Sequence, residues 1–143
     1  MPANQSTSAG LEYGPTVNGK MYLSKYKHRG NGSLQHKNMW CIPPDTEYDI
    51  FYNSDKHNLR DVNQNYWGVL QTGKETLGTN GERLSKFPCT SNIQDPWHGY
   101  PVSPLEERKR DALPPDFDLL VEKWIKDEVI DKAVGRKIQK EKI

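Results

Sequence analysis

The chain has 143 residues, a length typical of one domain that buries a sizeable core without disulfide bonds or metal ions. Hydrophobic residues make up 34% of it, below the roughly 45–50% (Gly included) of an average domain, which predicts a small core and many loops. Four Trp, seven Tyr and three Phe argue against a disordered chain and predict that aromatic rings carry much of the packing. A formal net charge of +1 excludes the global basic excess of a typical nucleic-acid-binding domain.

The composition also predicts a cytoplasmic protein without membrane spans. No apolar run approaches the ~18 residues of a membrane helix, and segment 1–10 lacks the apolar stretch of a signal peptide. Cys41 and Cys89 lie outside any spacing typical of a zinc site. A disulfide is possible on the count alone, but without an export signal we expect two reduced thiols, and we expect Cys41 to lie in the core because Trp40 and Ile42 flank it.

We expect residues 1–15 to form a flexible leader and residues 16–143 to form a single α+β domain. The leader consists of small and polar residues without periodicity. Segment 20–26 alternates in hydrophobicity between two Asn/Gly turn signals, which predicts a strand. Similar patterns predict further strands over 34–42, 47–53 and 65–71. Together these segments predict a small antiparallel sheet.

The second half of the chain is expected to contain a long loop and then the C-terminal helices. Gly and Pro recur throughout 72–115, which predicts a long Pro/Gly-rich loop with one exposed helical turn at 106–111. Apolar residues in 117–124 follow the i, i+3, i+4, i+7 spacing of a helix face. Asp116 is placed to cap this helix and Asp127 to cap a second one. We expect these helices to pack on one face of the sheet.

The most distinctive candidate site is segment 95–104, the Pro/aromatic segment, in which Pro96 and Pro101 restrict the backbone. Trp97 and Tyr100 could be the anchors of a rigid partner-binding loop, with Asp95 and His98 at its rim. His98 could also serve as a general acid or base. The alternative interpretation is that Trp97 and Tyr100 fill the core beneath the loop while His98 is merely solvated.

A second candidate site is the basic segment 25–37, which lies in a stretch without carboxylates between Tyr13 and Pro44. Its cations, interleaved with Tyr and His, could hold a nucleic-acid backbone: Lys25, Lys27, Arg29 and Lys37. If the segment is a hairpin, His28 and His36 could approach each other and supply the base and the acid of metal-independent RNA cleavage. The alternative interpretation is a solvated hairpin tip.

Two other patterns carry little chemical signal. Segment 68–74 has the glycine spacing and the Lys of a phosphate-binding loop, but Glu75 stands where Ser or Thr would hold Mg²⁺. Asp45, Glu47 and Asp49 could bind a metal from alternate positions of a strand, but such acids are more typical of a solvated edge. We therefore expect neither a metal nor a cofactor.

Two functional hypotheses follow from these features. The first is a small cytosolic protein-interaction domain that binds a protein partner through segment 95–104 and the C-terminal helices, since paired catalytic groups are scarce and Trp, Tyr and Arg suit interfaces. The alternative is an RNA-directed protein, in its enzymatic form a metal-independent ribonuclease that uses His28, His36 and His98. Histidines clustered in one place would favour the ribonuclease, and dispersed histidines would favour the interaction domain.

Overall fold

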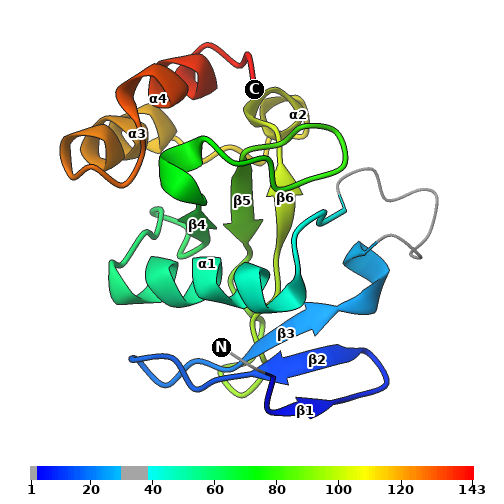
Figure 1. Ribbon diagram of the computed structural model, residues 1–143. Coiled ribbons are helices and arrows are strands. Elements are labelled where there is room, and N and C mark those ends of the chain that lie inside the picture. Colours follow the sequence, from blue (N-terminus) through cyan, green and yellow to red (C-terminus); the bar gives the residue numbers. More distant parts are fainter. Residues whose placement is uncertain (1–2, 30–38) are drawn as a thin grey trace.

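The computed structural model describes residues 3–29 and 39–143, and over these residues it contains two three-stranded antiparallel sheets and four α-helices (Figure 1). The first sheet has the order β1 (Gln5–Ser6), β2 (Gly10–Tyr13), β3 (Tyr22–Lys25). The second has the order β4 (Tyr66–Gly68), β5 (Leu84–Phe87), β6 (Tyr100–Val102). The helices are α1 (Pro44–Lys56), α2 (Pro104–Lys109), α3 (Phe117–Lys126) and α4 (Lys132–Gln139), with 3₁₀ turns η1 (Tyr26–His28) and η2 (Gln71–Gly73). The predicted α+β class is confirmed.

Helix α1 lies at the centre of the molecule and contacts both β3 of the first sheet and β4 of the second (Figure 1). Two hydrophobic clusters flank the second sheet. One is rich in aromatic rings and includes Tyr66, and the other includes Trp67 and the buried faces of α3 and α4. Because successive residues of a strand point to opposite faces, β4 supplies a ring to each cluster. This strand is therefore a wall shared by both parts of the core.

The strand predicted over 47–53 is wrong, because this segment belongs to helix α1. Pro44 occupies the first turn, where the missing N–H costs nothing. Tyr48, Phe51 and Tyr52 stand at i, i+3 and i+4, so the ring-rich sequence satisfies a helical period as well as the alternation that suggested a strand.

Residues 3–15 differ from the expected flexible leader, since β1 and β2 lie within them. Tyr13 is fully buried, and its hydroxyl donates a hydrogen bond to the Asp45 carboxylate. An added Cβ at Gly10 would lie 2.0 Å from the Ser24 carbonyl oxygen, so β2 and β3 approach as closely as they do only with glycine there. Few apolar residues mark these strands; β2 pairs with β3, and β1 pairs with β2 at the edge of the sheet.

The long loop predicted over 72–115 contains β5, β6 and α2, so the antiparallel structure is divided between two sheets. Strand β5 is buried along its whole length although it includes Lys86. The ammonium group of Lys86 lies 2.9 Å from the Glu107 carboxylate of α2, and both side chains are buried. A charged residue interrupts the hydrophobic pattern, which is why the sequence reading missed this central strand.

The C-terminal helices agree with the prediction from apolar spacing. Phe117, Val121 and Trp124 are buried on one face of α3. Asp116 occupies the N-cap position without a capping hydrogen bond from its side chain. Asp131, rather than Asp127, caps α4, because its carboxylate accepts a hydrogen bond of 3.1 Å from the Ala133 N–H.

None of the helices in the described part of the chain combines the length and apolar composition that crossing a membrane requires.

Both cysteines are free thiols at the surface, which corrects the prediction that Cys41 lies in the core. The Cys41 Sγ–H is directed at the Thr76 carbonyl oxygen at 3.9 Å, and the Cys89 Sγ–H at the Thr90 carbonyl at 3.7 Å.

We expect a thiol-specific disulfide reagent to label two groups per folded chain, because exposure governs access to the thiolate. The denatured protein should give the same count, and one unreactive thiol in the folded protein would contradict the exposed placement.

Candidate functional site

Two histidines identified in the sequence lie face to face in the structure. The ring centroids of His28 and His98 are 6.0 Å apart, and the ring planes differ by 6°. The Tyr100 ring lies 5.7 Å from His28. We call these residues, together with the neighbouring Lys25 and Lys27, the histidine cluster. It joins residues of the basic segment to residues of the Pro/aromatic segment, which the sequence analysis treated as separate sites.

Backbone pairing brings these two distant segments together. The Leu23 N–H donates to the Trp97 carbonyl at 2.7 Å, and the Trp97 N–H donates to the Met21 carbonyl at 2.8 Å. His98 directly follows this bridge, and β6 begins two residues later. On the other side, β3 continues into η1, which carries His28. The positions of both imidazoles are therefore set by one short parallel contact between the two sheets.

The surroundings of His98 are positively charged. Burial, together with the nearby charges of Lys25 and Lys27, lowers the pKa of His98 to about 4. Burial and the charge of Lys27 also lower the pKa of Lys25. At neutral pH, His98 is thus an uncharged imidazole next to two ammonium groups. Such a place attracts an anion and offers it a proton acceptor.

The remaining basic residues do not join this cluster. The Arg29 guanidinium lies 2.6 Å from the buried Glu47 carboxylate and also donates to the Ser24 hydroxyl and the Ile42 carbonyl. Arg29 therefore links β3 to α1 and is not part of the histidine cluster. His36 and Lys37 lie outside the described residues.

The Pro/aromatic segment is divided between the core and the surface. Trp97 is only 5% exposed and packs in the aromatic cluster, with its ring 4.9 Å from that of Tyr66. An interface anchor must be accessible, so the position of Trp97 agrees with the alternative interpretation, in which it fills the core. Tyr100 is half-buried, and Asp95 is exposed and accepts a hydrogen bond of 3.3 Å from the Asn92 amide.

The three acids of segment 45–49 lie on helix α1 rather than on alternate positions of a strand. Glu47 is fully buried against Arg29, and Asp45 accepts a hydrogen bond from Tyr13. Over residues 3–29 and 39–143, no three His, Cys, Asp or Glu side chains are grouped so as to hold a metal ion.

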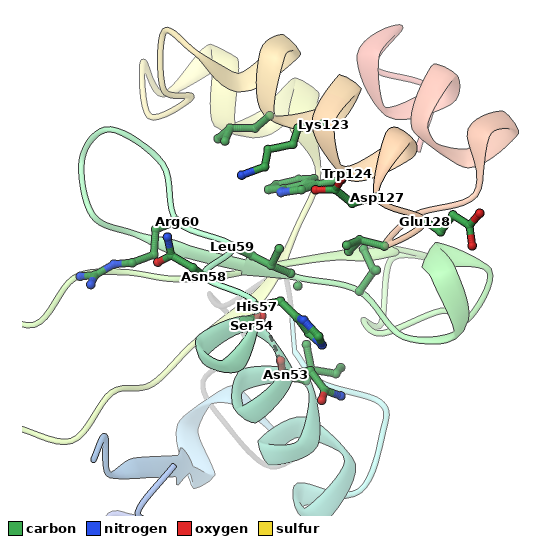
Figure 2. Close-up of a pocket in the computed structure, with 15 residues that line it drawn as sticks. Asn53, Ser54, His57, Asn58, Leu59, Arg60, Lys123, Trp124, Asp127 and Glu128 are labelled. Atoms are coloured by element: carbon green, nitrogen blue, oxygen red, sulfur yellow. Dashed lines mark hydrogen bonds between the residues drawn. The ribbon is translucent and has the colours of Figure 1, made fainter. Parts of the chain in front are cut away.

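A pocket of about 610 Å³ between α1 and α3 was not anticipated from the sequence (Figure 2). Its walls come from the end of α1, the segment that follows it, β4, and the end of α3. His57, at the C-terminal cap of α1, lines this pocket and not the histidine cluster. No motif links these four segments in the sequence, so only the folded chain reveals the pocket.

No family model, curated protein or solved structure matches this chain, so its function must be inferred from the geometry of these sites.

Proposed function

We propose that this protein acts on RNA and that the histidine cluster is a metal-independent phosphodiester-cleaving site. The observation that carries the proposal is the parallel stacking of His28 on His98 beside Lys25 and Lys27. Two imidazoles supply a proton acceptor and a proton donor, and two ammonium groups offset the charge of the phosphodiester. Histidines that meet in one place are the feature expected of the ribonuclease.

The roles of the two imidazoles follow from their surroundings. His98, uncharged at neutral pH, accepts the proton of the RNA 2′-hydroxyl, and the 2′-oxygen forms a bond to phosphorus. The bond from phosphorus to the 5′-oxygen breaks, and that oxygen takes a proton from His28 in its protonated state. The products are a 2′,3′-cyclic phosphate and a free 5′-hydroxyl. Stacked rings repel each other when both are charged, so at most one imidazole of the pair carries a proton in the reacting state.

Cleavage of an end-labelled single-stranded RNA in the presence of a chelator tests this function. His28→Ala and His98→Ala are each expected to reduce the rate by about 10²–10⁴-fold, the usual contribution of a general acid or base. His57→Ala is the matched control, since His57 is an exposed histidine in the other pocket. The melting temperatures of all three variants should be compared to separate chemistry from unfolding.

The dependence on pH and salt sharpens this test. Because the pKa of His98 is lowered to about 4, the base stays deprotonated in mild acid, and the acidic limb of the rate profile should fall near pH 4. RNA binding should weaken as salt rises, and Lys25→Gln or Lys27→Gln should reduce the salt slope by about one unit each. Full activity in His98→Ala, or equal cleavage of a 2′-deoxy substrate, would contradict the proposal.

The protein-interaction function stays a prediction. This hypothesis depended on the Pro/aromatic segment as a binding loop with Trp97 as its main anchor. Because Trp97 is buried, it is not accessible to a partner in the folded protein.

A further inference from the structure

Two kinds of side chain line the pocket between α1 and α3 (Figure 2): buried or half-buried aliphatic ones, which we call its floor, and mostly exposed polar ones, which we call its rim. The floor is formed by aliphatic side chains from separate parts of the chain: Ile50, Leu59, Val69, Leu120 and Val129. Its volume of about 610 Å³ lies within the ~300–1,000 Å³ typical of sites for small molecules. The polar groups of the rim therefore decide which kind of molecule fits.

Trp124 places an unused hydrogen-bond donor at this pocket. The indole is 3% exposed and lines the pocket; over the described residues the one buried side-chain N or O atom without a partner is Asp116 Oδ1, so the Trp124 nitrogen is not sealed in the core. By contrast, the Trp40 N–H donates to the Gly99 carbonyl at 2.9 Å, and the Trp67 N–H donates to Asp61 at 2.8 Å. The Trp124 N–H is therefore open to the pocket and can donate to an acceptor from outside the chain.

Opposite charges flank this indole on the same helix. Lys123 and Asp127 stand four residues apart on α3, yet over the described residues no ion pair joins them. The order Lys before Asp is the less favourable one for such a pair. Glu128 adds a second carboxylate beyond the helix end, with a left-handed backbone (φ 61°). Figure 2 shows Lys123, Trp124 and Asp127 extending side by side from α3, with His57 across the pocket at the end of α1.

From this arrangement we infer that the pocket binds a small zwitterion of the amino-acid or dipeptide class. The ligand carboxylate accepts from the Lys123 ammonium and the Trp124 N–H, and its ammonium group faces Asp127, which lies beside Trp124 in Figure 2. The apolar side chain of the ligand covers the aliphatic floor. This site is independent of the RNA-directed function proposed above.

Other simple ligand classes fit the rim less well. A plain anion would meet two carboxylates, and a plain cation would meet the Lys123 ammonium. A neutral apolar molecule would desolvate charges of both signs without offering either a partner, which is costly. A zwitterion compensates both charges and satisfies the indole donor at once.

Calorimetric titration with free leucine, free phenylalanine and the dipeptide Leu-Leu tests the inference. At least one of these probes should bind saturably, and the size of the best one distinguishes an amino acid from a dipeptide. N-acetylation or C-amidation of that probe should weaken binding by about tenfold or more, because each removes one charge-assisted contact. Absence of saturable binding at millimolar concentrations, or equal binding of the blocked derivatives, would overturn the inference.

Variants of α3 locate the site. Lys123→Gln and Asp127→Asn should each weaken the best probe about tenfold or more, and Trp124→Phe should do so while keeping an aromatic ring. Lys126→Gln and Asp118→Asn are matched controls, because both residues are exposed on α3 outside the pocket. Binding that responds equally to the controls would place the ligand elsewhere and overturn the assignment.

Discussion

Replacing Glu47 with alanine is expected to lower the free energy of unfolding by about 3–5 kcal/mol, the usual cost of leaving a buried charge without its partner. Glu47 is fully buried and accepts hydrogen bonds from the Tyr22 hydroxyl, from the Ser24 hydroxyl at 2.7 Å and from the Arg29 guanidinium at 2.6 Å. Burial raises the pKa of Glu47, and Arg29 and these hydrogen bonds oppose that effect. Without the Glu47 carboxylate, the Arg29 guanidinium and the Tyr22 hydroxyl would lose their partner between β3 and α1.

Urea denaturation of Glu47→Ala measures this cost. Glu75→Ala, at an exposed position, is the control and should change stability by no more than about 0.5 kcal/mol. The double variant Arg29→Met/Glu47→Leu should recover much of the loss, because removing both charges leaves neither unpaired. A loss below about 1 kcal/mol in Glu47→Ala would show that the ion pair does not hold β3 on α1.

Trp97→Ala is expected to cost about 3–5 kcal/mol of stability, as large-to-small changes of buried aromatic residues do. The indole packs 5.8 Å from the Phe51 ring and 4.9 Å from the Tyr66 ring, and the Arg60 guanidinium lies 5.6 Å above it. The truncation would open a cavity where the two sheets meet. Trp97→Phe should cost clearly less, since it keeps a ring in place.

Thermal and urea unfolding measure this second effect, with Ile93→Ala as the control. Ile93 is 96% exposed, so its truncation should leave stability nearly unchanged. A Trp97→Ala protein that melts within a few degrees of the parent would contradict the core placement and would restore the interpretation of Trp97 as an interface anchor.

The parts of the fold that could be predicted are those whose hydrophobic period is unambiguous. Helix α3 shows a clean apolar face, and the strand at 22–25 lies between turn signals. Helix α1 was missed because its rings satisfy two periods, and β5 because its buried Lys86 hides the pattern. Lys86 is buried because it pairs with Glu107, and Glu107 lies on a different element, helix α2.

The candidate site shows the same division between local and tertiary information. His28 and His98 could each be identified from the residues around them. Their stacking could not be predicted, because it depends on the parallel contact of Tyr22 with Trp97, two residues far apart in the sequence. The pocket at Trp124 carries no local signal either, since four segments must meet before it exists. Sequence patterns show the periodicity of a single helix or strand, but they do not show which helices and strands contact one another.

The contact between β3 and Trp97 also sets an order of events during synthesis. A ribosome adds about 5–20 residues per second, so Tyr22 leaves it on the order of 4–15 s before Trp97 does. Through that interval the N-terminal strands lack the partner that covers them, and the rings of Tyr13, Tyr22 and α1 remain open to solvent, chaperones and proteases. The nascent chain is therefore exposed to chaperones and proteases until the segment that contains Trp97 has been synthesised.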